Sequence, residues 1–172
     1  MAKVRCTMVI SPNGFISKLD GNEDWIDEVN WTDFLADVKK HNNCILGRAT
    51  YDLVPELDEA EAQYKLVVTS DSIFNVRPGY KVVNSPQEAI DFLKDKDIEE
   101  ILLIGGGGVN TSFLKAGLVN EVELFIAPHI IGQGKPVFKY DDFEIDLQLI
   151  KVEQLSKDRV KVLYRVKNRV KL

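Results

Sequence analysis

The sequence has little cysteine and no excess of positive charge, and both scarcities narrow the classes of protein it can be. Two cysteines occur among 172 residues, and they do not form a Cys-x-x-Cys pair of the kind found in zinc and redox sites. Lys and Arg number 22 against 27 Asp and Glu, a net charge of −5, whereas nucleic-acid surfaces are usually basic and clustered. We therefore expect no metal site, no nucleic-acid partner, and buried free thiols at Cys6 and Cys44, which lie in apolar runs.

Long apolar runs are also missing. No segment approaches the roughly 20 apolar residues of a membrane-spanning helix, and the opening stretch MAKVRCTMVIS has no cleavage-like region. These absences predict a cytoplasmic protein without membrane contact. Hydrophobic residues make up 45% of the chain and charged residues 28%, which is typical of a globular protein. With no repeat or linker, the length predicts one domain over residues 1–172.

Hydrophobic periodicity predicts alternating strands and helices. Strands are expected at residues 4–10, 44–47, 65–69, 80–83, 100–104, 122–127, 147–155 and 160–166, with a short extended piece at 15–17, and helices at 32–40, 86–94 and 109–116. Thr32 or Asn30 is the expected N-cap of the first helix. The helix at 109–116 joins two strands, which predicts a parallel βαβ pair, and the last two strands predict a hairpin. The result is an α/β fold with a mainly parallel sheet and an antiparallel C-terminal hairpin.

Four consecutive glycines, Gly105–Gly108, lie between a predicted strand and a predicted helix. Backbone amides at a helix N-terminus, with no side chains in the way, suit a phosphate group. The run is not a Walker A loop, because Gly108 is followed by valine and asparagine rather than Lys and Ser/Thr. It is not a Rossmann fingerprint either, because Asn110 replaces the third glycine. The alternative is a tight turn without a ligand.

Two further strand ends carry groups that suit a phosphate. Gly47 is followed by Arg48 and, two residues later, by Thr50, which supplies a turn, a basic side chain and a hydroxyl at the start of the next helix. Thr69 and Ser70 supply two hydroxyls at the end of another strand. Arg48 on a surface turn and simple capping by Thr69 are the structural alternatives. Because parallel strands end at the same edge of a sheet, we expect all three segments at one ligand site.

These segments occur in an order that resembles the dihydrofolate reductase superfamily. The matching pieces are ILGRATY (45–51), VVTS (67–70) and LLIGGGGVNTSFL (102–114). Two more pieces, SPNGFISKLDG (11–21) and LVNEVELFIAPHIIGQGKPVF (118–138), are more similar to the RibD C-terminal domain family, the reductase domain of bacterial riboflavin biosynthesis. The resemblance implies a three-layer αβα fold, NADPH as cofactor and a homodimer. Residues 126–131 are then either an interface segment or an interior strand end.

The resemblance also implies roles for individual residues. Gly47, Arg48 and Thr50 would contact phosphates on the adenosine side, and Thr69 and Ser70 would lie near the adenosine ribose and its 2′-phosphate. The pyrophosphate and nicotinamide side would be wrapped by Gly105, Gly106, Gly107, Gly108, Val109 and Asn110, with a cis peptide between Gly105 and Gly106. Dihydrofolate reductases often carry a basic residue where Gly108 stands and an aromatic one where Asn110 stands. Arg48 is therefore the main candidate for reading the 2′-phosphate.

The substrate side has weaker motifs. Asp33 lies near the place of the carboxylate that dihydrofolate reductases carry on their first helix, and Asp37 shares its face, although both also suit a solvated helix. Asn13 replaces the Asp of the Ser-x-Asp-Gly motif in riboflavin reductases. We expect Asp33, Asn13, Asp20 or a water to supply a proton. Trp25 and Trp31 suit either the floor of a ring-binding cleft or the core.

Together these features predict hydride transfer from NADPH to a planar C=N or to a carbonyl of a small heterocyclic or sugar-like substrate. The specific expectation is a 5-amino-6-(5-phosphoribosylamino)uracil reductase. Dihydrofolate reduction is the alternative reaction, and a non-enzymatic nucleotide-binding protein that kept the fold is the alternative of another class.

Overall fold

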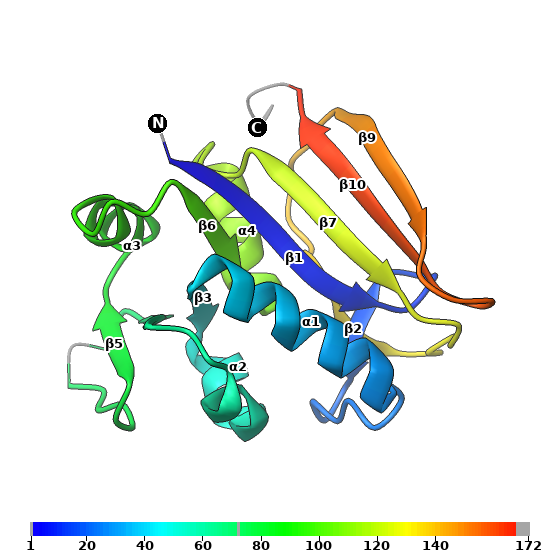
Figure 1. The fold of residues 1–172 in the computed structure, drawn as a ribbon, viewed down its shortest axis with the longest axis horizontal. Coiled ribbons are helices and arrows are strands. Elements are labelled where there is room, and N and C mark those ends of the chain that lie inside the picture. The colour runs from blue at the N-terminus through cyan, green and yellow to red at the C-terminus, as the bar shows by residue number, and fades with distance from the viewer. Residues whose placement is uncertain (1, 72, 168–172) are drawn as a thin grey trace.

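The computed structural model describes residues 2–71 and 73–167 and shows a central sheet of eight strands (Figure 1). Residues 1, 72 and 168–172 of the predicted 1–172 domain lie outside the described residues. The strands are β1 (Lys3–Ile10), β2 (Phe15–Lys18), β3 (Asn43–Gly47), β4 (Tyr64–Val68), β5 (Tyr80–Val83), β6 (Glu100–Leu103), β7 (Glu121–Ile126), β8 (Gly134–Pro136), β9 (Leu147–Gln154) and β10 (Val160–Val166). The helices are α1 (Glu28–His41), α2 (Arg48–Leu53), the 3-10 helix η1 (Pro55–Glu59), α3 (Pro86–Lys94) and α4 (Gly107–Lys115).

The strand order β5-β4-β3-β6-β1-β7-β10-β9 confirms the predicted sheet. The first six strands in this order pair in parallel, and β10 pairs antiparallel with both β7 and β9. One expectation was wrong in its detail: β6 and β7 run parallel but are not neighbours, because β1 lies between them. Local periodicity detects both strands but cannot detect an N-terminal strand that returns to separate them.

Alternation along the central strands builds a core on each face of the sheet. Ile45 of β3 and Leu103 of β6 point into the core under α3 and α4, whereas Leu46 and Leu102 point into the core under α1 and α2. In Figure 1, α1 crosses one face while α4 lies behind the other. This confirms the three-layer αβα arrangement. Both cysteines are buried and free, as predicted, and burial raises the pKa of each thiol.

Local sequence signals predicted one helix start correctly and another wrongly. At α3, Pro86 occupies the first turn and Ser85 accepts a bond from the Glu88 N–H at 3.1 Å, so the predicted range 86–94 is confirmed. The start predicted for the first helix was wrong. The cap is Asp27, which accepts from the Asn30 N–H at 2.7 Å, while the Thr32 hydroxyl donates within the helix to Glu28 O.

Two short elements were not predicted, η1 and β8, and α2 was expected only as a helix start near Thr50. Each is too short to show a hydrophobic period. β8 pairs with β2 in a separate two-stranded sheet. Among residues 2–71 and 73–167 no helix is long and apolar enough to cross a membrane, and no group of three His, Cys, Asp or Glu could hold a metal.

Candidate functional site

A cleft of about 560 Å³ opens where β3, β4 and β6 end. The segments that follow these strands lie together because parallel strands present their carboxyl ends at one edge. Of the residues predicted to contact a dinucleotide, those lining the cleft are Gly47, Arg48, Thr50, Thr69, Ser70, Gly106, Gly107, Gly108 and Val109. The structure therefore brings the three predicted segments to one site.

The glycine loop at the end of β6 is shaped by close backbone contacts. Gly105 has a φ of +96°, a left-handed conformation that favours glycine. A Cβ there would lie 2.8 Å from Met8 Cε, the flexible end of a side chain. The Gly105 carbonyl accepts from the Gly47 N–H at 2.7 Å, which joins the ends of β3 and β6. The peptide between Gly105 and Gly106 is cis, as the family resemblance implied.

Helix α4 begins inside this loop and directs its N-terminus at the cleft. Gly106 is its N-cap and provides no side-chain cap, so the N–H groups of the first turn have no partner within the helix. A Cβ on Gly108 would meet no atom within 4 Å, so this residue borders open space. Beside the loop, the Thr50 hydroxyl lies 3.2 Å from the position of a Cβ on Gly106. This is a suitable cradle for an anionic group.

A strap formed by β8 and the residues after it holds the loop from the outside. The Lys139 N–H donates to Gly107 O at 3.2 Å, and the Asn110 amide donates to Val137 O at 2.9 Å. Pro136 O lies so close to Gly107 that a Cβ there would approach it to 2.3 Å. Gly105 and Asn110 are fully buried, so they support the loop from beneath instead of lining the cleft.

Arg48 lies at the rim of the cleft, where its guanidinium is paired with two carboxylates. Its guanidinium is 2.8 Å from Asp71 and 3.5 Å from Asp52, and lies 4.5 Å over the Phe74 ring. About half of the side chain is exposed. The Thr69 hydroxyl accepts from the Asp71 N–H at 3.2 Å, so this strand end also orients the carboxylate that pairs with Arg48. An entering phosphate would compete with two exposed carboxylates for this guanidinium.

The three residues predicted to supply a proton lie apart from the cleft lining. The Asn13 amide donates to Ile131 O at 2.7 Å and accepts from the Ser11 hydroxyl, so both of its polar ends hold a loop. Asp20 is exposed and accepts from the Asn22 N–H in a turn. Asp33, on α1, pairs with Arg159 at 3.2 Å. None of the three is among the described residues that line the cleft.

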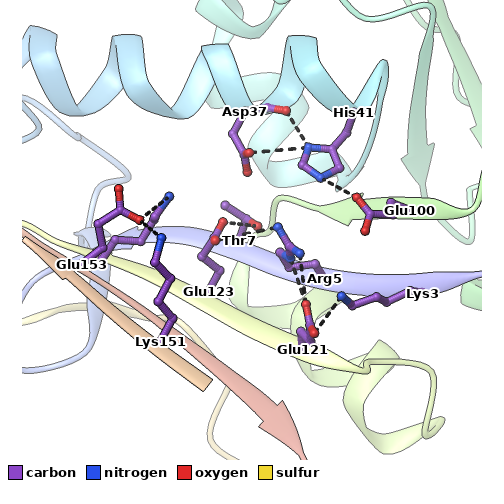
Figure 2. Close-up of polar contacts among 11 residues, drawn as sticks. Lys3, Arg5, Thr7, Asp37, His41, Glu100, Glu121, Glu123, Lys151 and Glu153 are labelled. Carbon is purple, nitrogen blue, oxygen red and sulfur yellow. Dashed lines mark hydrogen bonds and ion pairs between the residues drawn. The ribbon is translucent and has the colours of Figure 1, made fainter. Parts of the chain in front are cut away.

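Asp37, one turn after Asp33, faces the sheet instead of solvent (Figure 2). Its carboxylate lies 3.5 Å from His41 Nδ1, whose other ring nitrogen is 3.3 Å from Glu100. Buried Glu123 lies nearby, and its pKa is raised by burial and by the charge of Asp37. These acids therefore belong to a cluster of polar contacts between α1 and the sheet, away from the cleft.

Sequence reasoning missed Glu23, a half-buried acid that lines the cleft. Burial and the nearby charge of Glu56 raise its pKa to about 7, although the Lys135 ammonium opposes them. Glu23 follows the turn Asp20-Gly21-Asn22 and its carbonyl accepts from the Ile26 N–H. The turn residues signal a change of direction, but no local pattern says that the next side chain points inward.

Replacing Glu23 with glutamine is expected to stabilise the protein at neutral and alkaline pH but not in acid. The folded-state pKa of about 7 exceeds the ordinary 4.5, so ionisation costs more in the folded than in the unfolded state. The wild type therefore loses about 1–3 kcal/mol as pH rises through this interval, and the variant does not. Thermal denaturation of both proteins between about pH 4.5 and pH 7 measures the difference between their free energies of unfolding. A difference that does not change with pH would contradict the prediction.

Several known proteins are similar to this chain over most of its residues. The family model for the RibD C-terminal domain matches residues 2–161. The uncharacterized protein YyaP of Bacillus subtilis (strain 168) is 26% identical over 174 residues, which cover 91% of each chain. The riboflavin biosynthesis protein RibD of Corynebacterium ammoniagenes is 25% identical over 146 residues, 74% of this chain and 43% of RibD.

Solved structures of other proteins superpose on most of this chain. A pyrimidine reductase-like protein from Corynebacterium diphtheriae superposes with a TM-score of 0.73 at 16% identity, covering 97% of this chain and 92% of its own. A diaminohydroxyphosphoribosylaminopyrimidine deaminase/5-amino-6-(5-phosphoribosylamino)uracil reductase from Thermotoga maritima gives 0.75 at 16% identity, covering 96% of this chain and 57% of its own. Identities this low show a common fold and nothing more specific.

Proposed function

Because the chain belongs to the RibD C-terminal domain family, we propose that it is a reductase that uses NADPH to reduce a small heterocyclic substrate. The observation that carries the proposal is the cleft at the ends of β3, β4 and β6, where a glycine loop, a basic side chain and several hydroxyls converge. A turn without a ligand would need neither the open space at Gly108 nor three such segments at one edge.

The residues of the cleft fit a dinucleotide. The first-turn N–H groups of α4 and the Thr50 hydroxyl would hold the pyrophosphate, because they offer donors beside open space. Thr69 and Ser70 would face the adenosine ribose, with Arg48 as the cation for the 2′-phosphate. NADPH would supply a hydride, and the protein would orient it and exclude water.

The relatives favour a substrate of riboflavin synthesis. The Thermotoga maritima protein is described as a 5-amino-6-(5-phosphoribosylamino)uracil reductase, and the Corynebacterium ammoniagenes relative as a riboflavin biosynthesis protein. We propose this aminouracil as the first substrate to test, with dihydrofolate as the alternative. The homodimer implied by the family resemblance is part of the proposal, and sedimentation velocity of the purified protein tests it.

Thermal-shift titrations with NADPH and NADH test cofactor binding. Replacing Arg48 with alanine is expected to weaken NADPH binding about 10-fold, because one charge-assisted contact is lost, while NADH binding stays the same because it lacks the 2′-phosphate. The control is Arg165→Ala, which replaces an exposed arginine on β10 and should change the affinity for neither dinucleotide. If neither dinucleotide stabilises the wild type at millimolar concentration, the reductase proposal is wrong. An unchanged preference in Arg48→Ala would remove only the 2′-phosphate assignment.

A further inference from the structure

A small apolar pocket of about 40 Å³ adjoins the cleft at its inner end. Its walls come from the end of β1, from α1 and from the segment after α2, and include Met8, Trp31, Phe34 and Leu57. Glu23 is the only ionisable side chain among the described residues that line it. The pocket shares Ile16, Glu23, Thr50 and Val54 with the cleft. A planar substrate lying in the cleft, with one edge at this pocket, would thus meet the dinucleotide site on one side and a single carboxyl on another.

Glu23 also borders a groove on the outer side. This groove has a volume of about 440 Å³, and its lining includes Asp24, Glu28 and Glu56. Asp24 and Glu28 are exposed, and Asp24 is paired with Lys18 at 2.7 Å. The charged groups that act on Glu23 across the site are Glu56, which follows α2, and Lys135 of the strap. Glu23 therefore lies between a small apolar pocket and a larger groove that is lined by exposed acids.

We propose that Glu23 is the acid that delivers a proton to the substrate. The inference rests on the proposed function. Reduction of a C=N bond requires a hydride on carbon and a proton on nitrogen; the reduced dinucleotide would supply the hydride and the Glu23 carboxyl the proton. The resulting carboxylate is reprotonated from bulk solvent through the outer groove. Each turnover therefore converts one C=N bond and one reduced dinucleotide into a CH–NH bond and the oxidised dinucleotide, and consumes one solvent proton.

The environment of Glu23 suits this role. An effective general acid has a pKa near the working pH, and the pKa of Glu23, about 7, meets this requirement. The apolar walls hold the carboxyl in its protonated form. Neither Asp20 nor Asp33 combines access to the cleft with such surroundings, since the first lies in an exposed turn and the second is paired with Arg159.

The test compares Glu23→Gln, which keeps the shape, with Asp24→Asn, which changes the adjacent exposed acid. The first readout is binding of 2,4-diaminopyrimidine, a planar base that accepts a proton on a ring nitrogen, followed by its ultraviolet difference spectrum. Glu23→Gln should weaken binding by about 10- to 100-fold, because a charge-assisted hydrogen bond is lost. Asp24→Asn should bind it as the wild type does.

The second readout is NADPH oxidation with 5-amino-6-(5-phosphoribosylamino)uracil as a function of pH. The wild-type rate should fall as pH rises through about 7, and Glu23→Gln should be about 100-fold slower with no such fall. Glu56→Gln should move the fall to lower pH and Lys135→Met to higher pH, because the first removes a negative and the second a positive charge near Glu23.

The outcomes separate the inference from the proposed function. Turnover in Glu23→Gln with the wild-type rate and pH profile would overturn the inference, as would failure of the wild type to bind the aminopyrimidine or equal binding by the variant. Binding that depends on Glu23 without turnover of the aminouracil supports the inference and rejects that substrate. Failure of the wild type to bind NADPH would reject the reductase proposal itself.

Discussion

Replacing Gly107 with alanine is expected to weaken NADPH binding by about 100-fold, the order of loss produced by a displacement of about 1 Å at a positioned site. The new methyl would lie 2.3 Å from Pro136 O, a backbone atom that cannot rotate away. Either the strap or the start of α4 must move, and Lys139 N would lose its bond to Gly107 O. The same overpacking should lower the free energy of unfolding by about 1–3 kcal/mol.

Gly108→Ala is the matched control for stability, one residue further along the same helix turn. A Cβ there meets no atom within 4 Å, and alanine is a better helix former than glycine by about 1 kcal/mol. Its stability should be equal to or higher than that of the wild type. Isothermal titration with NADPH and thermal denaturation measure both effects. Equal affinities for the wild type and Gly107→Ala would show that the strap yields freely, and that the loop does not depend on it.

Replacing Asn43 with alanine is expected to lower the free energy of unfolding by about 3 kcal/mol, because two buried backbone groups and one partly buried one lose their partner. The Asn43 amide donates to His41 O and to Glu100 O, each at 2.8 Å, and its carbonyl accepts from Leu102 N at 3.1 Å. β3 and β6 are in ladder register only at Ile45 and Leu103. Asn43 therefore joins the two strands where their backbones do not pair.

Asn42→Gly provides the comparison at the adjacent position. Asn42 is exposed and has a φ of +57°, which glycine adopts without strain. Its hydrogen bonds to Gln63 are exposed to water. The free energy of unfolding should therefore fall by less than about 1 kcal/mol. Urea denaturation of both variants gives the two values. A loss of less than 1 kcal/mol in Asn43→Ala would mean that water replaces the amide between β3 and β6.

The sequence by itself determined the features that depend on residues close together in the chain. The apolar run at Cys44, Ile45 and Leu46 identified a buried strand, and Pro86 marked a helix start to the residue. The glycine run after β6 and the Gly-Arg-x-Thr turn after β3 could be assigned to one site, because parallel strands end at the same edge of a sheet. Residue type, short-range spacing and chain direction were sufficient for these inferences.

Only the tertiary structure decided the contacts between distant segments. Asp33 is paired with a residue 126 positions later, β1 separates β6 from β7, and the strap lies against Gly107. Glu23 acquires its raised pKa from burial and from Glu56, neither of which its own turn encodes. The physical reason is the same in each case: burial, strand order and the electric field at a side chain are set by which remote surfaces pack together, and hydrophobic periodicity does not specify those partners.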